Sequence, residues 1–102
     1  MAATEGMNDK VRLFFEALSD QNRVRIIDVL LESESNVRKI CAHFSMKQPS
    51  VSHHLAVLKK GGLVKTRKSG TKIFYSVNKK YVTSIMTYYF ARFGFQVKEI
   101  EE

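Results

Sequence analysis

The stretch QPSVSHHLAVLKKGGLVKTRKSGTKIFYSV (residues 48–77) decides the fold, because the spacing of its apolar residues changes from helical to alternating partway along. In its first part, Val51, Leu55 and Leu58 recur at the i, i+4 and i+7 spacing of one helix face. Pro49 suits the first turn of such a helix, where its missing N–H is not needed. We therefore expect a helix over residues 48–60.

Beyond this helix the period of the apolar residues falls from 3.6 to 2. Gly61 and Gly62 end the helix. Two short β-prone runs follow, at residues 63–68 and 72–77, with Ser69-Gly70-Thr71 between them. A glycine-containing tripeptide at this position is typical of a hairpin turn. The pattern predicts a helix followed directly by a β-hairpin.

The chain on either side of this stretch is predicted to be helical, because apolar residues recur there at helical spacing between polar breaks. Asp20 and Asn78 are the expected N-caps of the helices that follow them. Residues 32–36 are expected to form a polar connection. Further helices are expected over about residues 8–18, 21–31, 37–44 and 79–93. The expected fold class is mainly α with a small β-hairpin, in the order α-α-α-α-β-β-α. This is a winged helix-turn-helix, in a single domain over residues 1–102.

The charges are distributed unevenly along the chain. Lys and Arg number 17 and Asp and Glu 10, for a net charge of +7, yet no acidic residue lies between Ser35 and Lys98. A surface that needs only solubility mixes both signs, whereas a stretch of one sign favours a polyanionic partner. We therefore expect double-stranded DNA as the partner. An anionic membrane surface fits less well, because the cations are spread over several predicted elements and no apolar run is long enough to span a bilayer.

The face of the 48–60 helix opposite its apolar stripe carries small, uncharged or basic groups. At ~100° per residue, His53 points away from the stripe. Such a face can approach base edges without repelling phosphates, although a solvated helix in a basic protein would look the same. His54 lies nearer the core boundary, as a phosphate contact or a packing residue. The candidates for reading bases are Gln48, Ser50, Ser52 and His53.

Four cations bracket the glycine-containing tip of the hairpin, and no acidic residue is near them in the sequence: Lys65, Arg67, Lys68 and Lys72. Lysines on edge strands also discourage aggregation, which is the alternative explanation. Their density favours contacts with the DNA backbone or the minor groove. Such contacts supply affinity and register, while the helix reads the sequence.

The motifs ALSDQNRVRII, QPSVSHHLAVLKKGGLV and KTRKSGTKIFYSV resemble those of the ArsR/SmtB (arsenic-repressor-like) family of winged-helix regulators, over about residues 13–89. The resemblance implies a homodimer that binds an inverted-repeat operator, usually as a repressor released by a signal. Lys47 departs from the family, which often has a Ser or Thr cap there. The resemblance matches Gln48, Ser50, Ser52, His53 and His54 to the recognition helix, and Arg67, Lys68, Gly70 and Lys72 to the wing.

The predicted first and last helices carry more aromatic side chains than a small core can bury. A dimer interface explains this excess better than a ligand pocket does. The resemblance likewise implies a dimer built mainly from these two helices, about residues 8–18 and 79–93. The interface residues expected are Phe14, Phe15, Val82, Ile85, Met86, Tyr89, Phe90 and Phe93.

No metal site or other cofactor is expected. Metal-sensing members of the resembled family often carry a Cys-x-Cys pair, where this chain has Asn36 and Arg38, or His and carboxylate ligands on the last helix, which residues 81–95 lack. Cys41 and His43 face different directions on a helix, so no four-ligand zinc site can be assembled. The sequence names no effector.

Three alternatives remain beside the DNA-binding regulator without metal. Cys41 could act as a redox switch, because Arg38 and Lys39 can stabilise its thiolate, although a buried inert thiol is the commoner outcome. A metal-responsive repressor and a winged-helix protein-interaction module are the other two. An enzyme is not expected, because no catalytic constellation appears at usable spacing. The single cysteine also suits the reducing cytoplasm.

Overall fold

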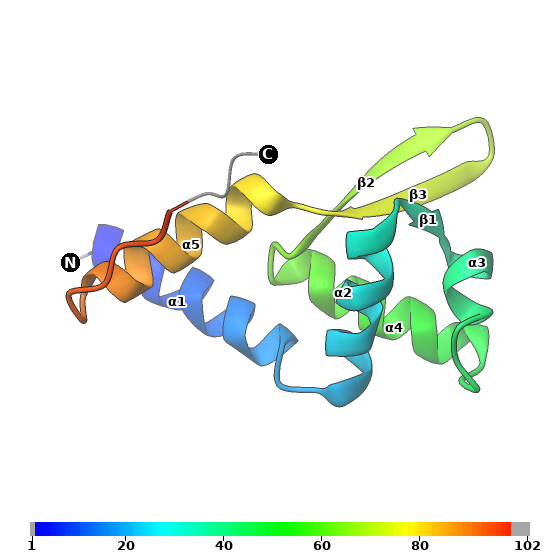
Figure 1. Ribbon diagram of the computed structural model, residues 1–102, viewed down its shortest axis with the longest axis horizontal. Coiled ribbons are helices and arrows are strands. Elements are labelled where there is room, and N and C mark those ends of the chain that lie inside the picture. The colour runs from blue at the N-terminus through cyan, green and yellow to red at the C-terminus, as the bar shows by residue number, and fades with distance from the viewer. Residues whose placement is uncertain (1, 99–102) are drawn as a thin grey trace.

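The computed structural model describes residues 2–98. The ends of the domain expected over residues 1–102, including the acidic Glu99, Glu101 and Glu102, lie outside the described residues. The expected fold class is confirmed, with one additional short strand. In chain order the elements are α1 (Ala2–Ala17), α2 (Gln21–Glu32), β1 (Ser35–Asn36), α3 (Val37–Cys41), α4 (Gln48–Lys60), β2 (Val64–Ser69), β3 (Lys72–Val77) and α5 (Lys79–Ala91) (Figure 1).

The helices form one body from which the hairpin projects. α1 and α5 lie side by side at one end of the molecule, and the β2–β3 hairpin, the wing, extends above α2 and α3 toward the other end (Figure 1). α4 packs against α1, α2 and α3. The helix expected to read DNA is therefore held by three others on its inner side.

The core lies where these helices meet. Val51, Leu55 and Leu58 of α4 are each 0% exposed, which confirms that this stripe faces inward. Removing side chains of this size from water supplies about 1.5–3 kcal/mol each. The rest of the buried core is Val11, Phe14 and Ala17 of α1, Ile26 and Leu30 of α2, Ile40 of α3, Leu63, Val64 and Ile85.

The three strands form an antiparallel sheet in the order β1-β3-β2. Asn36 and Arg67 both pair with Phe74, from opposite sides of β3. β1 replaces part of the polar connection expected over residues 32–36. Two residues are too few to show strand alternation, so the sequence carried no signal for this strand.

The capping residues stand where the sequence placed them, and three helix ends differ. Oδ1 of Asp20 accepts from the amides of Asn22 and Arg23 at the start of α2, and Oδ1 of Asn78 accepts from Tyr81 at the start of α5. α1 begins earlier than expected, and α5 ends at Ala91. α3 ends at Cys41 rather than near residue 44, because the next amides bond back only three residues.

Two glycines end α4, and each has a distinct steric reason. Gly62 has φ +82°, and a Cβ there would lie 2.1 Å from the Tyr81 ring of α5. A Cβ at Gly61 would lie 2.8 Å from the Ala17 Cβ of α1. The junction between α4 and the wing is therefore in close contact with both α1 and α5.

Candidate nucleic-acid interface

The outer face of α4 is free of packing. Gln48, Ser50, Ser52 and His53 are all exposed, as their positions opposite the buried stripe require. Within residues 2–98, the side chains of Ser50, Ser52 and His53 make no hydrogen bond. The helix therefore presents small polar groups that are available to an external partner.

His54 differs from its neighbour because it is half-buried and bound within the chain. Nη1 of Arg23 lies 3.2 Å from Nδ1 of His54. The same guanidinium donates from Nε to the carbonyl of Ala17 at 2.7 Å and from Nη2 to that of Glu16 at 3.2 Å. Arg23 thus joins the carboxyl end of α1 to α4. This contact favours the packing role among the two expected for His54.

The amino end of α4 has no side-chain cap. Lys47 occupies the N-cap position with extended backbone, and its side chain makes no capping hydrogen bond. Its carbonyl accepts from the amides of Ser50 and Val51, which starts the helix. An ammonium group at this position adds a cation beside the outer face instead of satisfying an amide.

The tip of the wing carries Lys68, Gly70 and Lys72, all of them exposed. Gly70 has φ +62°, which the tight turn requires and which other residues rarely adopt. These three residues therefore stand where the sequence placed them, at the end of a thin hairpin.

The sequence has no acidic residue near the wing cations, but the fold brings one to Arg67. Glu34 accepts two hydrogen bonds from its guanidinium, at 2.9 Å from Nε and 2.6 Å from Nη2. The guanidinium holds the pKa of Glu34 below its ordinary value. The two residues are 33 positions apart, so only the sheet brings them together.

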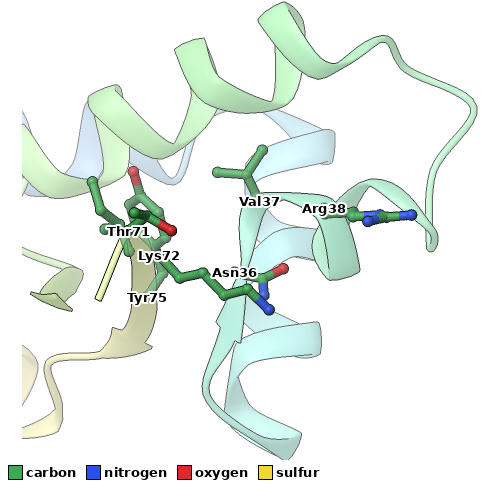
Figure 2. A pocket seen from close by; sticks show the side chains of 7 residues that line it. Asn36, Val37, Arg38, Thr71, Lys72 and Tyr75 are labelled. Atoms are coloured by element: carbon green, nitrogen blue, oxygen red, sulfur yellow. The ribbon is translucent and has the colours of Figure 1, made fainter. Parts of the chain in front are cut away.

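A shallow cavity of about 320 Å³ separates the wing from α3. In Figure 2, Lys72 extends from the wing toward Asn36, while Arg38 points away from the wing. The Oδ1 atom of Asn36 accepts from the amide of Lys39 and so caps α3. The positions that match the family's Cys-x-Cys pair therefore carry a capping amide and a cation. The cavity is lined by Asn36, Val37, Arg38, Thr71, Lys72, Ile73 and Tyr75.

The expected dimer-interface residues divide into two groups. Phe14 and Ile85 are only 1% and 2% exposed, so they belong to the core of one chain and present no surface to another. Phe93 is 61% exposed, Phe15 is at the border of exposure, and Val82, Met86, Tyr89 and Phe90 are half-buried. Spacing alone could not separate the groups, because both follow the helical period.

Aromatic rings form a connected group at the α1–α5 end. The Tyr89 ring centroid lies 5.1 Å from that of Phe15 and 5.4 Å from that of Phe93. Phe95, which the expected interface set omitted, is 65% exposed and lies 6.4 Å from Phe90. We call these five residues the aromatic end.

The sensing residues considered from the sequence are spread apart. Cys41 is half-buried against the core, and His43 is exposed. Within residues 2–98, no three His, Cys, Asp or Glu side chains are grouped so that they could hold a metal ion. Among the described helices, none is both long and apolar enough to cross a membrane.

Comparison with known proteins gives consistent matches. Residues 20–66 match the model of a family described as "Bacterial regulatory protein, arsR family". The transcriptional repressor SdpR of Bacillus subtilis is 38% identical over 64 residues, which are 63% of this chain and 71% of SdpR. The transcriptional activator HlyU of Vibrio cholerae is 30% identical over 77 residues, 76% of this chain and 71% of HlyU.

The fold is also found among solved structures. The homodimeric winged helix-turn-helix DNA-binding domain of Mb0332 from Mycobacterium bovis, a possible ArsR-family transcriptional regulator, superposes with a TM-score of 0.70. The match covers 94% of each chain at 24% identity. At that identity the likeness shows the fold.

Proposed function

Because the chain belongs to the arsR family of bacterial regulatory proteins, we propose that it is a transcription repressor that binds an inverted-repeat site on double-stranded DNA as a homodimer. One observation carries the proposal. The exposed face of α4, which has no acidic residue, stands in the same chain as a basic wing. A helix for base edges and a thin cationic hairpin for the backbone are the two parts that sequence-specific binding needs.

In this proposal α4 enters the major groove. Its outer residues are short, so the helix backbone can approach the bases closely, and they offer both donors and acceptors. Lys47, Lys59 and Lys60 place cations at both ends of the helix, where phosphates flank the groove. The reading residues proposed are Gln48, Ser50, Ser52 and His53.

The wing contributes affinity that is independent of sequence. Lys68 and Lys72 are exposed beside the Gly70 turn, and each phosphate that they neutralise releases a counterion. Arg67 belongs to the same set by sequence, but Glu34 already binds its guanidinium. Lys68 and Lys72 are therefore the proposed phosphate ligands of the wing.

The aromatic end is the proposed dimer interface. A homodimer matches an inverted repeat because the two-fold axis of the protein coincides with that of the DNA. Such a dimer can repress by covering its site, and SdpR, the more identical of the two relatives, is a repressor. The proposed location is the cytoplasm, which suits the single free Cys41.

A selection experiment tests the DNA-binding proposal. The full chain is incubated with a duplex library that has a randomised centre, and the bound duplexes are amplified and sequenced. We expect enrichment of an inverted repeat whose half-sites lie about one helical turn apart. Binding without an enriched repeat would show that the chain does not read sequence.

Sedimentation tests the interface. Phe93→Glu should give monomers, because Phe93 is largely exposed and a charge would be buried without a partner in the dimer. Leu31→Glu is the matched control, since Leu31 is 52% exposed on α2. If Phe93→Glu still sediments as a dimer, the interface lies elsewhere.

A further inference from the structure

Arg67 is held by groups from two other segments of the chain. Both of its hydrogen bonds end on the Glu34 carboxylate, which precedes β1. Its guanidinium carbon also lies 4.7 Å from the centroid of the Phe74 ring on β3. A planar guanidinium that is paired on one edge and stacked on its face has little freedom left. Arg67 therefore ties β2 to the segment that enters β1.

The strand register explains how this contact arises. Arg67 lies opposite Phe74, and Phe74 lies opposite Asn36, two residues after Glu34. Directly opposed residues share one face of a sheet, so the Arg67 side chain crosses the middle strand to reach Glu34.

The two faces of the sheet have different surroundings. Val64 and Val77 pack against the helical core, and Lys68 is on the same face by the period of two. Arg67 is on the opposite face, which is directed away from the core. Neighbouring cations in the sequence therefore point to opposite sides of the wing. If the DNA lies between the wing and α4, Lys68 faces it and Arg67 does not. Lys72, which pairs with Ser69, is on the Arg67 side and reaches a phosphate only around the tip of the hairpin.

The Arg67–Glu34 ion pair orients the wing more than it stabilises the fold. Its side chains are 57% and 34% exposed, and exposed ion pairs stabilise proteins little. Its two hydrogen bonds, however, fix the direction of the Arg67 side chain. Backbone pairing with β1 already joins β3 to the helical body at Tyr75 and Phe74. The ion pair adds a second connection, from the outer strand β2 to the end of α2, which limits how far that strand can tilt.

We propose that Glu34 is a positioning residue for DNA binding, which holds Arg67 across the wing and so fixes the angle between the wing and α4, and that Arg67 does not contact DNA. The inference rests on the proposed function. It gives an acidic residue a role that favours DNA binding, although this residue lies beside the wing, which is proposed to contact phosphates.

A positioning role for Glu34 predicts a change in DNA affinity opposite to the change expected from its charge alone. Removing a negative charge from a DNA-binding protein should strengthen its attraction for phosphates. If Glu34 instead orients the wing, removing its charge should weaken DNA binding, because Lys68 would no longer be held against the backbone. Glu32 offers a matched control, because it is an exposed acid two residues away that makes no ion pair within residues 2–98.

The experiment measures fluorescence anisotropy on the duplex selected by the wild-type chain and on its scrambled control, across a salt series. The variants are Glu34→Gln, Arg67→Met, their double mutant and Glu32→Gln. Glu34→Gln should weaken binding to both duplexes by roughly tenfold and lower the salt slope, because the phosphate contact of Lys68 is lost. Glu32→Gln should bind as well as the wild type or better. The double mutant should be no weaker than the weaker single mutant, because both remove the same ion pair.

Two results would overturn the inference. One is tighter binding by Glu34→Gln, as for Glu32→Gln, which would make Glu34 only a local charge. The other is weaker binding and a lower salt slope in Arg67→Met while Glu34→Gln keeps the wild-type affinity and slope, which would make Arg67 a phosphate ligand that does not need Glu34. Circular dichroism confirms that each variant is folded. If the wild type selects no duplex, the proposed function itself fails, which is a separate outcome.

Discussion

α4 and the wing are both basic and exposed, but they are held in place in different ways. α4 is fixed along its whole length, because Val51, Leu55 and Leu58 are fully buried against three helices. The wing is held on β3 by backbone pairing with the two residues of β1 and, on β2, by the side-chain pair of Arg67 and Glu34. A rigid helix suits base recognition, which tolerates little displacement, while a hairpin suits the uniform backbone. α4 and the wing do not differ in the sign of their charge, but they differ in how they are attached to the rest of the domain.

The junction between them gives the largest expected effect. Gly62→Ala should lower the free energy of unfolding by about 3 kcal/mol, because Gly62 has positive φ and a Cβ there would overlap the Tyr81 ring. Urea denaturation at fixed protein concentration measures this. Gly70→Ala is the control, with positive φ but nothing within 4 Å of the added Cβ, and should cost about 1 kcal/mol. Equal costs would show that the contact with Tyr81 is not rigid.

His53 tests the role of α4. His53→Ala should weaken binding to the selected duplex by about 1–3 kcal/mol while leaving the scrambled duplex nearly unaffected. A dimer carries the change twice, so the loss can be up to double. His43→Ala, a histidine exposed outside α4, should change neither affinity. Equal weakening on both duplexes would place His53 on the backbone instead of on bases.

Lys68 tests the role of the wing. Lys68→Ala should weaken the selected and scrambled duplexes alike and lower the slope of log affinity against log salt by about 0.9 for each phosphate that is no longer neutralised. Lys10→Ala on α1 removes the same charge far from the wing and should leave the slope nearly unchanged. Weaker binding to the selected duplex alone would mean that the wing reads sequence as well.

Lys47 gives the smallest expected effect and separates stability from binding. Lys47→Ser should raise the free energy of unfolding by less than about 1 kcal/mol, because Pro49 has no amide hydrogen and a serine hydroxyl can accept only from the Ser50 amide, which already donates to the Lys47 carbonyl. The same change should weaken DNA binding slightly, since one cation is removed. Lys47→Ala is the control, which removes the cation without adding a cap. Equal stability of the two variants would show that α4 gains nothing from a cap.

The sequence was sufficient for features that depend on local period. The inward stripe of α4, the caps at Asp20 and Asn78 and the position of the hairpin follow from spacing and residue type alone. Features that depend on register across the sheet were not predictable. The Glu34–Arg67 pair requires β1, and β1 is too short to leave a pattern. Phe14 was assigned to the dimer interface for a related reason. Helical spacing predicts that a side chain is covered, but not whether its own chain or a partner chain covers it.

The hydrogen bond between Arg23 and His54 sets the tautomer that α4 presents. A guanidinium can only donate, so the Nδ1 atom that it meets at 3.2 Å must carry a lone pair. The neutral ring then has its proton on Nε2, and that nitrogen is left as a donor. In the proposed complex, His54 would therefore donate from Nε2 to a phosphate oxygen, the DNA contact expected for it from the sequence, and could not accept a hydrogen bond through that nitrogen. Through this one hydrogen bond, an arginine at the start of α2 determines whether a half-buried histidine on α4 donates or accepts at its Nε2 atom.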